Sequence, residues 1–460
     1  MELRRVLGFR DLVFFFALTC FSLRNVATAA EAGPSSLAVW VLAALGLFLP
    51  LVASVLELSS RYPEEGGLYV WTRRAYGNFP GFLAGFLYWA SNLPFFPALL
   101  YFTAANALFL GGARGAALQE NRTFFIAFSL AGIALATAVN ACGLKYGTWL
   151  HNSAALATWT TMALLVLCGG WTMLHGGSAT AFTAASLSPA AGLKGALFFA
   201  TIAFAYGGIE TASFLGDEIR DPRRSLPRAL LVSGVLITAL YIAGTASLLA
   251  ALPPGEASAL TGITKAIADV SARAGVPVLG FLAALLVTWA GVGATGAWLA
   301  TASRLPFVGG LDHFLPAAFA TLHPRWGTPV FALVTQSLLS AVFVVLSQAG
   351  TGVRGAYDAL LAMSVISYFI PYLFLFASTI RLSKAPMPEG ASRLPGGRPV
   401  AVALAVLGFV TTLAGLVLAF VPPDDEKNKT LAVVKIAGLT LLLVVLALAT
   451  YGASTRKRAA

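Results

Sequence analysis

The stretch of sequence that decides the fold is Phe204–Ala229, which reads FAYGGIETASFLGDEIRDPRRSLPRA. It begins inside a long apolar run, is interrupted by Tyr206-Gly207-Gly208, and places the carboxylate of Glu210 directly after the interruption. An unsatisfied backbone N–H or C=O in lipid costs several kcal/mol, so a helix broken at membrane depth must line a cavity or face a ligand. An ionisable side chain at that depth indicates a functional site. The stretch is typical of a discontinuous transporter helix.

The composition of the whole chain places this broken helix in a membrane. Of the 460 residues, 58% are hydrophobic and 11% are charged, whereas soluble domains carry roughly 25% charged residues. We expect an all-α integral membrane protein with about 12 transmembrane helices, each of roughly 20 residues or more. The apolar segments lie near 12–32, 38–58, 82–110, 123–140, 148–174, 193–216, 229–251, 277–302, 329–348, 356–380, 399–421 and 431–452.

The positive charge follows the expected topology. The net charge is +11, and most of the 30 Lys and Arg residues fall in segments that are cytoplasmic if both termini are inside. This positive-inside pattern favours an even number of spans, cytoplasmic termini and a location in the cell (inner) membrane. It explains the charge without a nucleic-acid partner. The first apolar run lacks a small-residue cleavage site, so we interpret it as a retained helix.

The sequence contains no pattern typical of an enzyme. Cys20, Cys142 and Cys168 lie in or beside apolar segments without pair spacing, and the four histidines are scattered near span ends. Such cysteines are typically small buried hydrophobic residues. There is no Walker motif. We therefore predict a non-enzymatic protein without metal or other cofactor, driven by an ion or substrate gradient.

The first and sixth apolar segments are the most irregular, and they stand five helices apart. Ser22-Leu23-Arg24-Asn25-Val26-Ala27 interrupts the first, as Tyr206-Gly207-Gly208 interrupts the sixth. Interrupted segments at corresponding positions of two halves indicate an inverted-repeat transporter with a site near the bilayer midplane. We expect a single transmembrane domain (1–460) with a first repeat at 9–175, a second at 192–381 and two additional helices at 399–452.

Three connecting segments are also expected to carry structure. Ser59–Phe79 mixes aromatic and charged residues and suits a short interfacial helix. Pro253–Val276 is expected to form an outer lid that contains a helix, and Gly309–Pro329 a cytoplasmic amphipathic helix with a turn.

Three motifs resemble the amino acid–polyamine–organocation (APC) superfamily. Phe204–Ala229 is similar to the sixth helix of that family, with an aromatic residue, a Gly-rich break, Gly-x-Glu and basic residues. Glu57–Trp71 resembles the segment after its second helix. Gly296–Ala300, followed by Leu311–Pro316 and Gly327–Pro329, resembles its eighth helix and the next loop.

The resemblance extends over about residues 9–381 and implies a LeuT-like fold. That fold has a 5+5 inverted repeat in which helices 1 and 6 are broken, here followed by two C-terminal helices. One feature departs from the family, whose first helix breaks at a Gly-rich motif. Here no glycine occurs between Gly8 and Gly33.

The two breaks are expected to bind opposite ends of an amino acid. Free N–H groups near Arg24–Ala27, at the positive end of a helix dipole, attract a carboxylate. Unpaired carbonyl groups near Phe204, Ala205 and Tyr206 accept hydrogen bonds from an ammonium group. The candidate substrate-binding residues are Ser22, Arg24, Asn25, Val26, Ala27, Ser91, Asn92, Phe204, Ala205, Tyr206, Gly207, Gly208 and Trp298.

Several of these residues have alternative roles. Arg24 either binds a substrate carboxylate, which favours anionic or zwitterionic ligands over polyamines, or pairs with Glu31 or Glu210, or lies in a misplaced span. Gly207 and Gly208 line the site or only permit tight helix packing. Asn92, beside Ser91, contacts the substrate or makes an interhelical hydrogen bond.

The aromatic residues and the coupling ion are equally open. The resemblance implies a gate at Phe204 and a pocket wall at Trp298, although membrane aromatics often only pack or anchor the interface. Glu210 either carries a coupling proton or is a structural carboxylate bound to neighbouring backbone amides. Sodium coupling is disfavoured because no hydroxyl pair can be assigned among Thr288, Thr295 and Thr301.

The function that these features favour is secondary active transport of a zwitterionic or anionic amino acid by alternating access, as a permease or antiporter. The expected partners are a small-molecule amino acid, a proton or exchange substrate as the coupling species, and the lipid bilayer. The alternatives are a polyamine or amino acid/amine exchanger and a non-transporting receptor with the carrier fold. The oligomeric state is left open.

Overall fold

The computed structural model describes residues 8–62, 66–190, 192–214, 222–253, 255–306, 314–387, 394–421 and 429–459. Regular structure in these ranges is entirely helical. Ten helical segments are long and apolar enough to cross a membrane. They are Ser35–Arg61, Asn78–Ala116, Arg122–Ala141, Tyr146–His175, Ser225–Ala251, Val278–Pro306, Val330–Ser347, Val353–Leu382, Gly397–Leu418 and Lys429–Thr455.

The remaining two expected spans are the broken ones. The first consists of α1 (Phe9–Cys20) and α2 (Leu23–Glu31), and the sixth of α12 (Gly192–Phe204), a turn and the 3-10 helix η3 (Ile209–Phe214). Together with the ten continuous segments they confirm the predicted architecture. The other α-helices are α3 (Ser35–Ala43), α4 (Leu49–Arg61), α5 (Gly67–Tyr76), α6 (Asn78–Ala90), α7 (Asn92–Ala107), α8 (Gly112–Ala116), α9 (Arg122–Ala141), α10 (Leu144–His175), α11 (Ala184–Leu187), α13 (Pro222–Ala251), α14 (Gly262–Arg273), α15 (Val278–Ala302), α17 (Val330–Ser347), α18 (Val353–Leu382), α19 (Gly397–Leu418) and α20 (Lys429–Ala459).

The first break lies earlier in the chain than expected. Only Phe21 and Ser22 leave the helix, and Arg24–Ala27, predicted to unwind, form the first turns of α2. Ser22 has extended backbone angles (φ −137°, ψ 129°) and stands at the N-cap, a position that serine favours. The leucine, arginine and alanines that follow are good helix formers, so the helix resumes at once.

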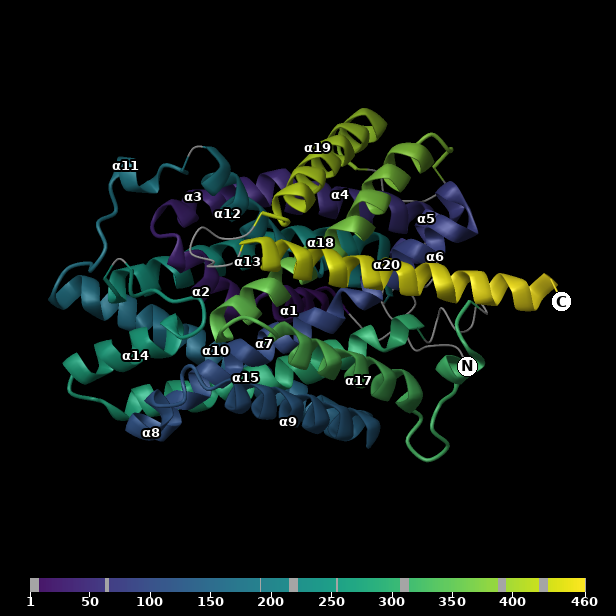
Figure 1. Cartoon of the computed structure of the whole chain (residues 1–460). Coiled ribbons are helices and arrows are strands. Elements are labelled where there is room, and N and C mark those ends of the chain that lie inside the picture. Colours follow the sequence, from purple (N-terminus) through teal and green to yellow (C-terminus); the bar gives the residue numbers. More distant parts are fainter. Residues whose placement is uncertain are drawn as a thin grey trace.

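The broken helices lie inside the bundle. Figure 1 shows α1 and α2 near its middle, with α19 and α20 toward the outside. α1 and α2 pack on α13, and α18 packs on α6 and α7, while α19 and α20 both pack on α18. Leu12 and Phe16 of α1 and Val26 of α2 have no exposed surface.

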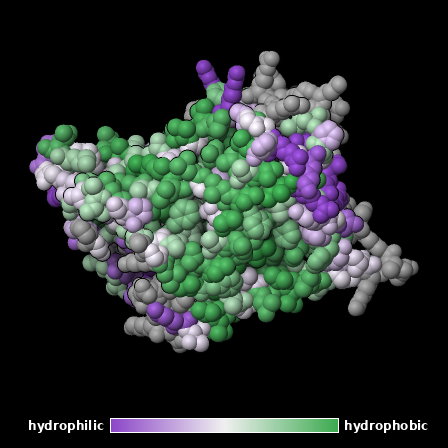
Figure 2. Space-filling model, turned by 90° about the horizontal axis from the view of Figure 1, so that it is seen from above, coloured by the Kyte–Doolittle hydropathy of each residue, from purple (hydrophilic) through white to green (hydrophobic). Residues whose placement is uncertain are grey.

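The surface agrees with a membrane location. Figure 2 shows hydrophobic residues over the middle of one face and hydrophilic residues gathered toward its ends. Many large apolar side chains are exposed on the long helices, including Leu167, Leu174, Val235 and Val417. In lipid such side chains need no burial inside the protein.

The connecting segments are partly as predicted. α5 and α14 are the helices expected within Ser59–Phe79 and Pro253–Val276, and they lie toward opposite ends of the bundle (Figure 1). The apolar residues of α5 are buried, and the helix packs against α6 and α18. Residues 309–313 of the third segment are outside the described ranges, and the described remainder contains only η5 (Ala317–Ala320).

Ionic contacts hold both ends of α18. At its start, Arg354 donates from Nη1 and Nη2 to the two carboxylate oxygens of Glu31 on α2, at 2.8 and 2.9 Å, and from Nε to Asp358 at 2.9 Å. Beyond its last turn, the Ala385 carbonyl accepts a hydrogen bond from Arg61 of α4, which also pairs with Glu57 at 2.7 Å. α2, the second half of the first broken helix, is thereby tied directly to α18.

Candidate substrate site

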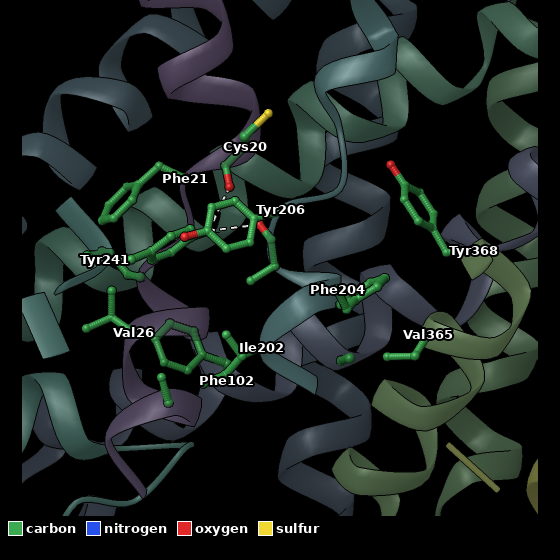
Figure 3. Packing of buried hydrophobic residues seen from close by; sticks show 14 of the residues in the cluster. Cys20, Phe21, Val26, Phe102, Ile202, Phe204, Tyr206, Tyr241, Val365 and Tyr368 are labelled. Carbon is green, nitrogen blue, oxygen red and sulfur yellow. Dashed lines mark hydrogen bonds between the residues drawn. The ribbon is translucent and has the colours of Figure 1, made fainter. Parts of the chain in front are cut away.

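Tyr241, a residue of α13, joins the two breaks. Its fully buried hydroxyl lies 2.7 Å from the carbonyl oxygen of Cys20 and 3.2 Å from that of Ala205. It also accepts hydrogen bonds from the Asn25 amide at 3.0 Å and from the Ser22 backbone N–H at 3.3 Å. Figure 3 shows Tyr241 beside Cys20 and Tyr206. A hydroxyl has one hydrogen, so Tyr241 can donate to only one of the two carbonyls at a time.

Aromatic packing fixes the position of Tyr241. Its ring stacks on Trp40 with 4.1 Å between centroids and 3° between planes, and it meets Tyr206 edge-on at 5.9 Å. The Tyr206 hydroxyl lies 3.0 Å from the Trp40 carbonyl and from Thr238 Oγ1. Sequence patterns gave no sign of Tyr241, because one tyrosine in an apolar run usually indicates packing or an interface anchor.

At the breaks, some backbone N–H donors and some carbonyl acceptors have no hydrogen-bond partner among the described residues. In the described part of the chain, the N–H groups of Leu23 and Arg24 at the start of α2 have no acceptor. Of the three carbonyls predicted to be unpaired, that of Phe204 accepts from the Gly207 N–H at 3.0 Å and that of Ala205 lies 3.2 Å from the Tyr241 hydroxyl. The carbonyls of Tyr206 and Gly207 have no donor in those same ranges. The breaks therefore offer donors at a positive helix end and, in the other broken helix, acceptors, which are the two kinds of group that a zwitterion requires.

Two aromatic residues, Phe95 and Trp298, form an aromatic wall between Arg24 and the sixth-helix break. A Cβ built on Gly208 would lie 3.3 Å from the Trp298 ring and 3.4 Å from Cys20 Sγ. Trp298 contacts Phe95 edge-on at 5.7 Å, and the guanidinium of Arg24 lies 5.2 Å from the centre of the Phe95 ring. Trp298 therefore lies beside the sixth-helix break, and Phe95, which contacts it, was not among the predicted residues.

A small cavity adjoins the site between the two broken helices. Its volume is about 10 Å³, roughly the space for one water molecule. Asn25, Thr28 and Ala29 of α2 line one side, and Phe204 of α12 and Ala205 of the following turn line another. The candidate residues of the two halves therefore share one space.

Glu210 is fully buried, and its two oxygens accept hydrogen bonds from three tyrosines and one backbone N–H of the described residues. Oε1 accepts from Tyr88 at 2.5 Å and from Tyr368, and Oε2 accepts from Tyr372 at 2.6 Å and from the Gly208 N–H at 3.1 Å. As a structural carboxylate, Glu210 was expected to bind neighbouring backbone amides, but only one of these donors, the Gly208 N–H, is such an amide. The tyrosines come from α6 and α18, and the spacing of Tyr368 and Tyr372 by four residues was a signal that they share a helix face.

Of the alternatives for Arg24, an ion pair with Glu31 or Glu210 is not formed among the described residues. Its side chain is buried, and Nη2 donates to Asn25 Oδ1 at 3.3 Å, but Nε and Nη1 have no acceptor among the described residues. Glu31 is bound by Arg354, and Glu210 is surrounded by tyrosines. The first span is not misplaced, because Arg24 lies in α2 directly after the break.

Other candidates are engaged locally. Ser91 donates to the Tyr88 carbonyl at 2.6 Å, and Asn92 donates to the carbonyls of Tyr88 and Trp89, so the described residues show no interhelical bond for Asn92. Phe204 packs edge-on against Tyr368 at 5.5 Å.

Two further sets of residues make other contacts. Val26 points toward α13, where a Cβ added at Gly244 would meet it at 3.1 Å, and Ala27 is fully buried beside it. Thr288, Thr295 and Thr301 each donate to the carbonyl four residues earlier. Among the described residues, no group of three or more His, Cys, Asp or Glu could hold a metal ion.

Comparisons with known proteins agree with this geometry. The family model described as amino acid permease matches residues 7–446. The transporter lpg1691 of Legionella pneumophila is 27% identical over 453 residues, covering 96% of each chain, and the serine/threonine exchanger SteT of Bacillus subtilis is 26% identical over 376 residues, covering 79% of each.

The solved structure of MhsT in complex with L-phenylalanine matches the fold. Its TM-score is 0.58 at 14% sequence identity, and the match covers 98% of this chain and 100% of that one. The all-helical arrangement with two broken helices is thus a LeuT-like fold. By its family match, this chain is a member of the amino acid permease family, within the APC superfamily.

Proposed function

We propose that this protein is a secondary active carrier that moves an anionic or zwitterionic amino acid across a cell membrane by alternating access. The observation that carries the proposal is the pair of breaks, joined by the Tyr241 hydroxyl, where the described residues offer no acceptor to the N–H groups of Leu23 and Arg24 and no donor to the carbonyls of Tyr206 and Gly207. An α-carboxylate and an α-ammonium group bind these two sets. Family membership supports the same substrate class.

The arrangement of α2 and α18 supports alternating access. The ion pair of Glu31 and Arg354 joins them at one end of the site, so opening that side requires this contact to separate. We place this end outside, with both termini in the cytoplasm of a bacterial-type inner membrane, because the positive charge of the loops favours that orientation. Glu210, enclosed by tyrosines, serves in this proposal as the structural support of the sixth-helix break.

A polyamine is disfavoured as the main substrate. The buried guanidinium of Arg24 lies beside the site and repels a ligand that carries only positive charge. Two alternative functions remain for the test below. One is an exchanger whose second substrate is an amine, and the other is a receptor that binds an amino acid without transporting it.

The proposal is tested with purified protein in liposomes and a panel of labelled amino acids and polyamines. Uptake or exchange of at least one amino acid is expected, with polyamines slower. Gradients of protons, of sodium or of internal amino acid, applied one at a time, identify the coupling species. Measurable binding without uptake under any gradient would support the receptor and contradict the carrier.

Tyr241→Phe tests the junction between the breaks. The change keeps the ring that stacks on Trp40 but removes the hydroxyl that contacts Cys20, Ser22 and Asn25. Leaving buried polar groups unsatisfied costs about 1–3 kcal/mol, so we expect exchange to slow by roughly tenfold to a hundredfold. The initial exchange rate is measured together with the thermal stability of the detergent-solubilised protein.

Tyr146→Phe is the matched control for this change. Tyr146 is 59% exposed, so loss of its hydroxyl should leave the rate unaltered. Wild-type rates in Tyr241→Phe would show that the hydroxyl has no part in transport.

A further inference from the structure

Arg24 is a buried cation to which the described residues offer no anion. Its side chain is 1% exposed, and only one hydrogen bond is present, to the neutral amide of Asn25. A guanidinium has five N–H donors, and Nε and Nη1 here have no acceptor in the described ranges. Burial of an ion costs several kcal/mol unless a counter-ion compensates it. Arg24 is therefore poised to bind an anionic group supplied by a ligand.

The backbone already provides for both charges of a simple amino acid. The N–H groups of Leu23 and Arg24 suit the α-carboxylate, and the carbonyls of Tyr206 and Gly207 suit the ammonium group. A zwitterion has no net charge, so binding it leaves the positive charge of Arg24 uncompensated. A ligand with one additional negative charge removes this imbalance.

Nearby acidic side chains do not compensate Arg24. Glu31 accepts both Nη hydrogen bonds of Arg354, and Glu210 accepts hydrogen bonds from three tyrosines and the Gly208 N–H. The structure records no ion pair between Arg24 and any described carboxylate.

The guanidinium also lies in the right place to reach a ligand in the site. It sits over Phe95, which contacts Trp298, and Trp298 lies against Gly208 at the sixth-helix break. Arg24 and the ammonium-binding carbonyls are thus connected by one aromatic wall. Its neighbour Asn25 lines the cavity between α2 and α12.

We propose that the carrier selects amino acids whose side chain bears a carboxylate, and that the guanidinium of Arg24 binds this second carboxylate. The inference rests on the proposed function, because it assumes an amino acid in the site. Arginine binds carboxylates through paired, charge-assisted hydrogen bonds, which are about twice as strong as neutral ones. An amide in the same position cannot neutralise the charge, so the acidic amino acids should be distinguished from their amides.

The test compares L-glutamate with L-glutamine, and L-aspartate with L-asparagine, on the full-length protein in liposomes. Each pair has nearly the same shape and differs in one charge. Competition against a labelled substrate should give about tenfold or greater preference for the acid. In Arg24→Gln the preference should fall to about threefold or less, mainly through weaker glutamate binding. Arg122→Gln, which removes an exposed arginine on α9, should keep the wild-type ratio.

The outcomes separate this inference from the proposed function. Uptake of neutral amino acids without preference for the acids would overturn the role of Arg24 and leave the carrier function intact. Binding of no amino acid from the wider panel of the proposed function, by correctly folded protein, would overturn both. If Arg24→Gln does not fold, the wild-type acid-to-amide ratio still decides the question, and Arg24→Lys, which keeps the charge, should retain part of the preference.

Discussion

Replacing Gly208 by alanine is expected to reduce transport at least about a hundredfold while the protein still folds. Gly208 has φ +114°, a backbone conformation that residues with a Cβ rarely adopt, and holding one there costs of order 1–3 kcal/mol. The new methyl group would lie 3.3 Å from Trp298 and 3.4 Å from Cys20 Sγ, between the two breaks. It would therefore both shift the sixth-helix break and occupy space beside the ammonium-binding carbonyls.

The effect is measured as the initial rate and the half-saturating concentration of exchange in liposomes. Gly177→Ala is the matched control, because Gly177 also has positive φ (+76°) but has open space around its Cβ position and lies on an exposed loop. It carries a comparable backbone cost away from the site. Equal losses of transport in the two variants would mean that general destabilisation, and not the site, explains the result at Gly208.

Replacing Glu210 by alanine is expected to destabilise the protein by more than about 3 kcal/mol and to abolish transport. The change leaves the hydroxyls of Tyr88, Tyr368 and Tyr372 without their buried acceptor, and each unsatisfied group costs about 1–3 kcal/mol. Glu210→Gln keeps the shape and one acceptor oxygen, so we expect it to fold with an intermediate loss of stability. Thermal unfolding in detergent measures both.

The two roles of Glu210 predict different behaviour of the glutamine variant. If the carboxylate is structural, Glu210→Gln transports more slowly but responds to a proton gradient as the wild type does. If the carboxylate carries a coupling proton, the variant binds and exchanges substrate with no response to the gradient. Tyr88→Phe, which removes only one donor, should lose stability without changing the gradient response.

The architecture was predictable because it depends on patterns of many residues. The length of the apolar runs and the glycines at Tyr206-Gly207-Gly208 gave the span number and the sixth-helix break. The first break was located only approximately, because its position depends on one N-cap residue, Ser22, in a segment without glycine. Ser22 forms the break and Arg24 follows it, but both are single polar residues in an apolar segment, so the sequence does not distinguish their positions.

The contacts within the site were less predictable. Tyr241 acts through a hydroxyl that reaches residues more than 200 positions away in the chain, and such pairing leaves no local pattern. The tyrosines around Glu210 come from two other helices for the same reason. Arg24 could be predicted because an ionisable residue in an apolar segment is unusual. That it does not pair with Glu31 could not be predicted, because Arg354 of a distant helix occupies that carboxylate.

The ion pairs of Arg354 should make the contact between α2 and α18 depend on the ionic strength of the surrounding solution. The Arg354 and Glu31 side chains are 38% and 37% exposed, so dissolved salt reaches them, and electrostatic screening shortens from about 8 Å at physiological ionic strength to about 3 Å at 1 M. Higher ionic strength on that side should weaken the tie between α2 and α18 and favour the open form. A spectroscopic distance between labels on these two helices should lengthen with salt in the wild type and be insensitive to salt in Arg354→Gln. The protein would then respond to the salinity of its medium as well as to its substrate.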